Sequence, residues 1–365
     1  MFTETRTLSK EDKLERREHS VELREFSRNI YEEIKRENDD KEIIDEELRV
    51  KTDFFKGNDG YTDEKIEEDN RLVNKKKKKF SKEKNKNSNG EIFEKVQACF
   101  FYRMLREKYL VVRSSDFDDL NGADGQIIER ATGNIICTID DSSTIDPDNI
   151  EEKKKKVLEQ NINGGSKIRY GLTFEKKENS DDMELIGKEL EGIPLFFLHV
   201  SEERLNELLN EMNYDLNGSP SEKEFEIFGE LVDMMIEEKE EIVKGIKERS
   251  EKKTTENEEV EKELNFCKNV LMKDCEENIS EIKEDLEQSD RMGKKRKKSL
   301  QESLKISMKK KDDLENRINR LENNINNFFM TEKHKVIALE NFDKVDELFE
   351  EMKKTADELF EKQKM

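Results

Sequence analysis

The sequence predicts an α+β protein, in which a small central domain with a mixed sheet is flanked by an N-terminal helical segment and by C-terminal helices. Three observations lead to this fold class. Charged residues make up 44% of the 365-residue chain and hydrophobic residues only 32%, so only part of the chain can form a packed core. Short runs rich in β-branched residues gather in residues 109–200. The stretches on either side consist largely of strong helix formers.

Changes in composition divide the chain into four parts. We expect an N-terminal helical segment at residues 1–55, a lysine-rich flexible linker at 56–89, an α/β domain at 90–215 and a coiled-coil helical region at 216–365. Residues 9–51 contain neither proline nor glycine, and their hydrophobic spacing predicts a long amphipathic helix or a pair of helices. The linker is expected because its composition leaves too little hydrophobic surface to offset the entropy lost on ordering.

The central domain is expected to begin with a helix over residues 91–109, followed by three strands, a second helix and further strands. The hydrophobic face of the first helix, suited to packing on a sheet, consists of Ile92, Phe93, Val96, Phe100 and Leu105. The strands are expected at residues 109–113, 123–129, 134–140, 166–177, 183–190 and 193–200. Asp146-Pro147 opens the second helix, which runs to about Asn161.

The C-terminal region is expected to form coiled-coil helices, because hydrophobic residues recur there on a seven-residue grid. The first set of grid positions comprises Leu300, Leu304, Leu314, Ile318, Leu321, Ile325 and Phe328. A second set comprises Phe342, Val345, Phe349, Met352, Ala356 and Leu359. The pattern breaks near Met330, which indicates either helices that fold back antiparallel or pairing with another chain. We therefore expect self-association or a protein partner through this region.

The charge pattern bears on other partners. A formal net charge of −21 opposes general affinity for nucleic acid. Two stretches are nevertheless basic: Lys75–Lys86, with eight lysines against one glutamate, and Lys294–Lys311. Local contacts with nucleic-acid phosphates are expected at these two stretches.

Several other classes of protein find no support in the sequence. It has no run of 18 apolar residues and no apolar core of a signal peptide, so we expect a cytoplasmic protein that makes no membrane contact. The cysteines lack the spacing of a zinc site or a disulfide framework. No GxxxxGK[ST], HExxH or paired CxxC motif occurs, which leaves nucleotide hydrolysis by a P-loop and zinc chemistry unsupported.

Acidic residues on separate elements of the central domain form a candidate site. Glu94 lies on the first helix in the pattern Gly90-x-x-x-Glu94, Asp124 lies in NGADG at the second strand, and Asp140 ends the third strand. This order of elements and acids resembles the PD-(D/E)XK nuclease-like superfamily, over about a third of the chain. The resemblance implies that Glu94, Asp124 and Asp140 bind one or two Mg²⁺ ions for the hydrolysis of phosphodiester bonds.

The sequence departs from the family's pattern at the lysine of the third strand, which orients or activates the attacking water. Ser142 stands where that lysine is expected. Related folds sometimes supply the cation from a helix, and Lys153–Lys156 lie on the helix that follows. Lys153 or a neighbour is therefore a candidate catalytic residue alongside the three acids. The alternative is a site that has lost catalysis while its scaffold persisted.

Three functions remain open from the sequence. The first is a nuclease-derived domain with a degenerate motif, whose coiled-coil arms act in nucleic-acid binding or assembly. The second is an active Mg²⁺-dependent nuclease, and the third is a purely structural coiled-coil interaction protein. Each acid also has a plain structural interpretation: Asp124 as a turn residue, Asp140 as a solvated strand end and Glu94 as a surface residue. A separation above about 8 Å between the carboxylates of Asp124 and Asp140 would favour an unrelated α+β fold.

Overall fold

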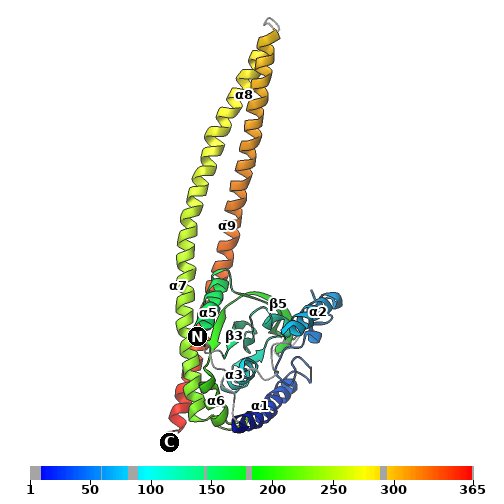
Figure 1. Cartoon of the computed structure of the whole chain (residues 1–365), viewed down its shortest axis with the longest axis vertical. Helices are drawn as coiled ribbons and strands as arrows, with labels where there is room; N and C mark the ends of the chain where they lie inside the picture. Colours follow the sequence, from blue (N-terminus) through cyan, green and yellow to red (C-terminus); the bar gives the residue numbers. More distant parts are fainter. Residues whose placement is uncertain are drawn as a thin grey trace. The chain divides into compact units, whose positions relative to one another are not determined.

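The computed structural model describes residues 10–58, 60–80, 89–143, 146–177, 183–287 and 294–363 (Figure 1). The chain divides into two compact units, the first comprising Met1–Gly245 and Ile337–Met365 and the second comprising Ile246–Val336. Helices α7 (Glu222–Phe266) and α9 (Lys294–Gln363) therefore contribute residues to both units. No described helix is long and apolar enough to span a membrane.

A four-stranded mixed sheet, in the order β1-β2-β3-β6, forms the main sheet of the first unit. Its strands are β1 (Tyr109–Arg113), β2 (Gly125–Glu129), β3 (Ile135–Ser142) and β6 (Leu195–His199). The first three pair antiparallel in succession, and β6 pairs parallel with β3. Helix α3 (Asn89–Leu105) precedes β1, and α5 (Pro147–Ile162) lies in the crossover that a parallel pair requires. The structure thus has the mixed helix-and-sheet composition that the sequence predicts.

The segment between α5 and β6 forms a separate two-stranded antiparallel sheet. Its strands are β4 (Ser166–Lys176) and β5 (Met183–Ile193). After β6 the chain enters α6 (Glu202–Glu211), whose first turn is capped by the Ser201 hydroxyl, which accepts a hydrogen bond from the Arg204 main-chain N–H (3.1 Å).

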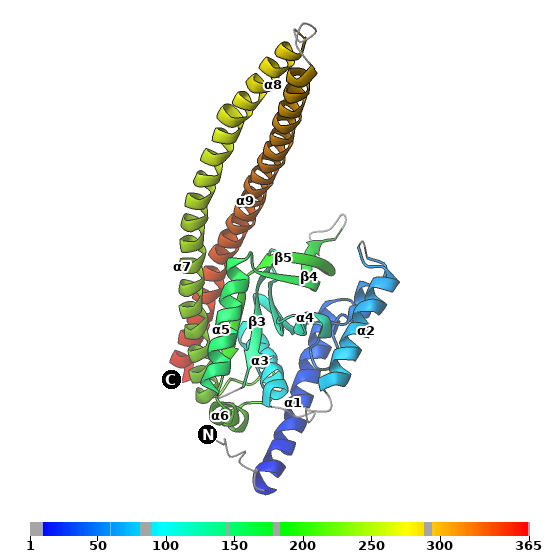
Figure 2. The ribbon, with the colours of Figure 1, turned by 45° about the horizontal axis from the view of Figure 1, so that its top comes forward.

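Helices α3 and α5 cover opposite faces of the main sheet (Figure 2). Phe93 and Phe100 on α3 are fully buried on one face. On the other face, Val157 of α5 packs against Leu195 and Phe197 of β6. Burial on both faces explains why the strands read as nearly continuous hydrophobic runs in the sequence.

The second hydrophobic grid of the C-terminal region packs on this sheet. Side chains alternate across a strand, so Phe196 of β6 points away from the α5 face. Its ring lies 6.1 Å from that of Phe342 and 5.6 Å from that of Phe349, both on α9. The end of α9 therefore belongs to the first unit. The coiled-coil region expected at residues 216–365 does not extend over this part of the chain, which packs on the sheet instead. The side chains of Ala356 and Leu359 lie outside the described residues.

Helix α1 (Lys10–Glu37) is shorter than the helical segment expected over residues 9–51. It ends where Asp39 and Asp40 adopt left-handed backbone angles, with φ of 56° and 60°. The chain then forms an arm of irregular backbone. This arm joins the edge of the main sheet through a parallel bridge between Arg49 and Arg113. Two short helices complete this side of the unit: η1 (Thr52–Phe55) and α4 (Asp116–Asp119).

Helix α2 (Asp63–Phe80) corrects the expectation of a flexible linker at residues 56–89. Its sequence is mostly charged, yet Ile66 and Val73 are buried against the rest of the unit. Packing on a neighbouring element is what stabilises a helix of low intrinsic hydrophobicity. Residues 81–88 lie outside the described residues.

The second unit is a helical hairpin. Its first arm runs from Ile246 along α7, through the π-helical turn η2 (Cys267–Leu271), into α8 (Met272–Glu287). The returning arm is the part of α9 up to Val336, beside the first arm (Figures 1 and 2). The arms run antiparallel, and ion pairs join them at Glu263–Arg317, Lys268–Glu322 and Glu276–Lys311. A buried cluster between the arms contains Cys267, Ile318 and Leu321, with Leu314 packed on it.

A buried carboxylate fixes α2 to β4. The two oxygens of Asp69 accept hydrogen bonds from Arg169 Nη1 (2.6 Å) and from the Tyr170 hydroxyl (2.8 Å). Asp69 is only 2% exposed, so the loss of this carboxylate leaves donors without their partner in a region with little water.

We therefore expect Asp69→Ala to lower the free energy of unfolding by about 3 kcal/mol. Urea unfolding followed by circular dichroism measures this change. Glu68→Ala, at an exposed position of the same helix, is the matched control and should change the free energy by less than about 0.5 kcal/mol. A wild-type stability in Asp69→Ala would mean that other contacts hold α2.

Candidate functional site

Acidic side chains gather where β2 begins and β3 ends. We define the carboxyl cluster as Glu94 of α3, Asp119 of α4, Asp124 before β2, and Asp140 and Asp141 of β3. The antiparallel pairing of β2 with β3 brings Asp124 beside the end of β3 although 16 residues separate it from Asp140 in the chain. Three of the predicted acids, Glu94, Asp124 and Asp140, are therefore neighbours in the fold.

Asp124 and Asp140 share a side-chain hydrogen bond, so their carboxyl groups are far closer than 8 Å. Asp124 Oδ2 also accepts a hydrogen bond from the Asp141 main-chain N–H (2.7 Å). Burial raises the pKa of Asp124 well above its usual range, and the charges of Asp119, Glu94, Asp140 and Asp141 raise it further. A proton on Asp124 allows it to donate to Asp140.

Lys153 supplies a cation from α5. Its Nζ lies 2.9 Å from Asp140 Oδ1 and donates a second hydrogen bond to the Asp141 main-chain carbonyl (3.0 Å). Nζ also lies 5.4 Å from the centroid of the Phe197 ring. Burial lowers the pKa of Lys153, but the charge and hydrogen bond of Asp140 outweigh it, so the net pKa is above the usual value. Lys153 therefore stays protonated.

Glu94 is near the cluster but is held by arginines. Arg113 Nη2 lies 2.6 Å from Glu94 Oε2, and Arg49 Nη2 lies 3.7 Å from the same oxygen. Arg49 also pairs with Asp119, at 2.6 Å. Burial raises the pKa of Glu94, and the two arginines oppose that effect. Glu94 is thus an ion-pair partner in this arrangement, and the surface position considered for it does not apply.

Asp141 is a residue of the cluster that sequence reasoning did not select. Successive side chains of a strand face opposite sides, so Asp141 faces the α3 side and Asp140 faces α5. Asp141 is 5% exposed, and neither of its carboxyl oxygens has a hydrogen-bond partner among the described residues. Burial, with the charges of Glu94 and Asp140, raises its pKa well above the usual range. Two consecutive acids at the end of a buried strand are the signal that could have identified it.

The balance of charge and the donor atoms suit a hard divalent cation. Among the described residues, the cations against the cluster are Arg49, Arg113 and Lys153, fewer than the acids. Carboxylate oxygens are the ligands that Mg²⁺ and Ca²⁺ prefer, and the unpartnered oxygens of Asp141 are available donors. However, no set of three or more His, Cys, Asp or Glu side chains within the described ranges has the convergence needed to hold a metal ion. The cluster has the chemistry of a metal site, but its side chains would have to rotate to form one.

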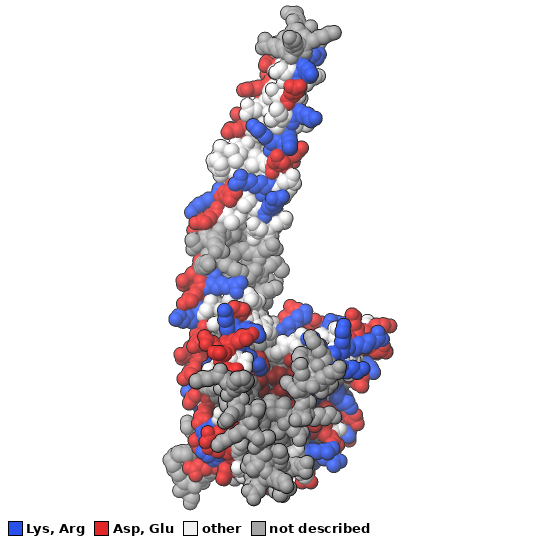
Figure 3. Space-filling view, viewed as in Figure 1, with Lys and Arg blue, Asp and Glu red and all other residues white. Residues whose placement is uncertain are grey.

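Helix α2 carries an exposed run of basic residues. Lys75, Lys76 and Lys77 are exposed there, and Lys77 Nζ pairs with Asp116 Oδ2 at 2.8 Å. Figure 3 shows blue side chains over the region of α2, while red and blue side chains are interspersed over much of the rest of the visible face. The residues from 81 to 86 that complete this basic stretch lie outside the described residues.

Comparison with known proteins found no matching family model, no similar curated protein and no similar solved structure.

The raised pKa values predict how stability depends on pH. A carboxyl group whose pKa is higher in the folded state contributes stability that is present below its unfolded pKa and is lost as pH rises through its folded pKa. Asp118, buried beside the cluster, has its pKa raised by burial to about 6, so part of this loss falls between about pH 4 and 6. The pKa of Asp141 is also raised well above its usual range, so its ionisation adds to this loss as the pH rises.

We expect Asp141→Asn to lose less stability than the wild type as the pH rises from 5 to 8 without divalent cations, because its side chain cannot ionise. Urea unfolding at the two pH values gives this difference. Asp148→Asn, at an exposed position of α5, should show the wild-type slope. Equal slopes in the wild type and Asp141→Asn would mean that Asp141 carries no buried charge.

Proposed function

We propose that the first unit is a divalent-cation-dependent phosphodiesterase of the PD-(D/E)XK nuclease kind, in which Lys153 of α5 replaces the missing strand lysine. The observation that carries this proposal is the contact of Lys153 Nζ with Asp140 Oδ1 at 2.9 Å, next to the hydrogen bond between Asp140 and Asp124. The order of helix, three antiparallel strands, helix and parallel strand supports it, because the resemblance implies the same order.

Asp124 and Asp140 are the residues that would hold Mg²⁺ where β2 begins and β3 ends, since their oxygens are hard donors. Asp141 faces the α3 side and would have to turn toward them to take part. A bound Mg²⁺ would lower the pKa of its water and stabilise negative charge on the phosphate. Glu94 is assigned a positioning role, because Arg113 already holds its carboxylate. Arg113 is itself 1% exposed and therefore fixes the place of Glu94 on α3.

Lys153 is proposed to stabilise charge on the substrate. Because its pKa is raised, it remains an ammonium at neutral pH and is a poor proton acceptor. It can therefore donate a hydrogen bond to a phosphate oxygen or orient the attacking water. Its side chain is 37% exposed and that of Asp140 is 16% exposed, so a substrate can reach this side of the cluster.

Nucleic acid is the substrate and partner proposed for this site. The exposed lysines of α2 are suited to phosphate contacts, and in the second unit Lys305, Lys309 and Lys310 are exposed on α9. These residues belong to the basic stretches at Lys75–Lys86 and Lys294–Lys311. A cytoplasmic location is part of the proposal, and it agrees with the free thiols found in the structure.

A second candidate function is a nuclease-derived protein without catalysis, which binds nucleic acid or assembles with a partner. The ion pair between Glu94 and Arg113 favours this alternative, because it occupies a carboxylate that the resemblance assigns to the metal. The exposed hydrophobic residues of the second unit would then provide a surface for self-association or a protein partner through coiled-coil contacts. They are Phe266, Val270, Ile306 and Met308.

The nuclease proposal predicts cleavage of DNA or RNA that requires Mg²⁺ or Mn²⁺. We expect Asp124→Asn and Lys153→Ala each to reduce the rate by about a hundredfold or more, because each removes a charge at the reacting phosphate or its cation. Gel assays on single- and double-stranded DNA and RNA measure the rate. Lys155→Ala, an exposed lysine on the same helix, is the matched control. Absence of cleavage on all four substrates with both cations would contradict catalysis and favour the second candidate.

Phosphate binding by α2 is tested separately from cleavage. In the Asp124→Asn background, the double substitution Lys75→Ala and Lys76→Ala should weaken binding of a DNA oligomer. It should also reduce the slope of log affinity against log salt by about 0.7–0.9 for each phosphate that a lysine no longer neutralises. Fluorescence anisotropy over a salt series measures both quantities. An unchanged salt slope would exclude these two lysines from the interface.

A further inference from the structure

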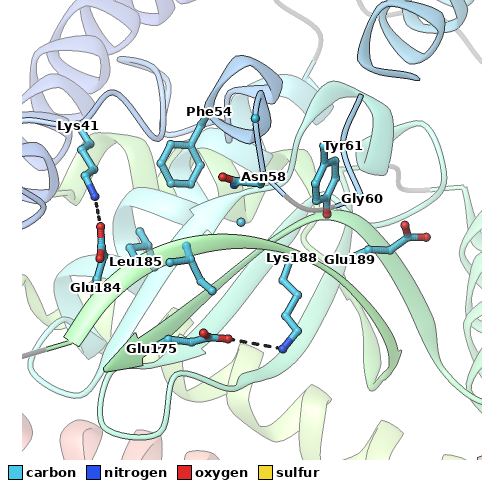
Figure 4. A pocket seen from close by; sticks show the side chains of 13 residues that line it. Lys41, Phe54, Asn58, Gly60, Tyr61, Glu175, Glu184, Leu185, Lys188 and Glu189 are labelled. Carbon is cyan, nitrogen blue, oxygen red and sulfur yellow. Dashed lines mark hydrogen bonds and ion pairs between the residues drawn. The ribbon is translucent and has the colours of Figure 1, made fainter. Parts of the chain in front are cut away.

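A groove with a volume of about 780 Å³ follows one side of β5 (Figure 4). Figure 4 shows Phe54, Asn58 and Tyr61 along this side of the strand, while Glu175 of β4 lies on the other side. The wall of the groove formed by β5 runs from Glu184 to Glu189 and includes residues from both faces of the strand. The edge of β5, rather than a face, therefore lines the groove.

The hydrogen bonds of β4 show which main-chain groups of β5 reach this edge. The main-chain N–H of Phe174 donates to the Gly133 carbonyl (3.3 Å), and that of Leu172 donates to Gln126 Oε1 (3.3 Å). Both N–H groups therefore point away from β5. In an antiparallel ladder, a residue whose N–H points away from the neighbouring strand belongs to a non-hydrogen-bonded pair. The main-chain N–H and C=O groups of the residue opposite it then also point away, toward the outer edge of their own strand.

The partners of Phe174 and Leu172 in this ladder are Leu185 and Gly187. The main-chain N–H and C=O groups of Leu185 and Gly187 hence point into the groove. Within the described ranges, no main-chain hydrogen bond joins them to any strand or loop. The N–H donors and C=O acceptors of these two residues alternate along the edge of β5. A second extended backbone presents donors and acceptors at the same spacing and can therefore pair with this edge.

We propose that this edge pairs antiparallel with β5 of a second copy of this chain, about a twofold axis at Ile186. This register opposes Leu185 to Gly187 of the second copy, so the groups that point into the groove on both strands meet as hydrogen-bonded pairs. In the same register, Glu184 of each copy lies opposite Lys188 of the other, so this pair occurs twice. Ile186 lies opposite Ile186 of the second copy. The two small sheets then join into one four-stranded sheet across two chains.

The charges of the strand select this occupant and this register. Glu184 and Lys188 lie on the same face of β5, two residues on either side of the axis. Each already pairs within its own chain, Glu184 with Lys41 and Lys188 with Glu175, and an identical strand adds a second opposite charge to both. Two alternative registers can be compared with this one. With the twofold axis at Leu185, Glu184 lies opposite Ile186 of the second copy, and with the axis at Gly187, Lys188 lies opposite Ile186 of the second copy. Both shifts keep the main-chain bonds but lose the ion pairs. The Phe55 ring packs directly on Gly187, so this position has no room for a side chain of its own.

Charge reversal tests the proposal. We expect the wild type to dimerise in sedimentation equilibrium, and Lys188→Glu or Glu184→Lys alone to weaken the dimer at least about tenfold, because each places like charges opposite one another twice. A mixture of the two variants should form a heterodimer with about the wild-type affinity, since every opposed pair is then of opposite charge. Lys76→Glu, an exposed lysine on α2, makes the same change of charge elsewhere and should leave the dimer unchanged.

A cross-link tests the register independently. In a Cys275→Ser background, Ile186→Cys should form a disulfide-linked dimer on mild oxidation, because the two equivalents face each other at the axis. Glu184→Cys should not, because it faces Lys188. A wild-type monomer, a dimer that both single reversals leave intact, no recovery on mixing, or cross-linking through Glu184→Cys in place of Ile186→Cys would overturn the proposal. Thermal melts of each variant verify that it is folded.

Discussion

The burial of several carboxyl groups at the ends of the central strands of a small sheet is the constraint on which this structure depends. Each group loses solvation and repels its neighbours, so the arrangement is stable only with opposing cations, shared protons or a bound ion. The cations come from different parts of the chain: Arg49 from the N-terminal arm, Arg113 from β1 and Lys153 from α5. The acids thus tie together elements from separate parts of the chain, and these contacts belong both to the fold and to the candidate site.

The need to offset buried negative charge also explains why the acids have different partners on the two sides of the cluster. On the side of α5, Asp140 has a lysine, a hydrogen bond from Asp124 and partial access to solvent, which is an arrangement suited to a reacting phosphate. On the side of α3, Glu94 is neutralised by Arg113, while the carboxyl oxygens of Asp141 are buried without a hydrogen-bond partner among the described residues. An unpartnered buried carboxylate requires a physical reason. The proposed cation site would supply one, because the charge that destabilises the free protein would become a ligand when the ion binds.

Much of the central domain could be predicted from the sequence, because its strands are hydrophobic runs and its turns carry local signals. The neighbourhood of Asp124 and Asp140 was expected from the resemblance of the element order and its acids to the PD-(D/E)XK nuclease-like superfamily. Helix α2 could not be predicted, since its anchor is the tertiary contact of Asp69 with β4. The role of Arg49 depends on the irregular segment after α1, where the hydrophobic residues show neither helical nor strand periodicity. Asp141 was missed because only the observed register decides which of two adjacent acids faces α3.

Our proposal that the carboxyl cluster binds a divalent cation is open to a direct test. The most direct measurement is anomalous diffraction from crystals of the protein equilibrated with Mn²⁺, an ion that favours the same oxygen ligands as Mg²⁺. The account predicts an anomalous peak within about 2.0–2.6 Å of oxygens from Asp124 and at least one of Asp140 and Asp141. Saturating Mn²⁺ with no peak at the cluster, or with a peak elsewhere, would contradict it.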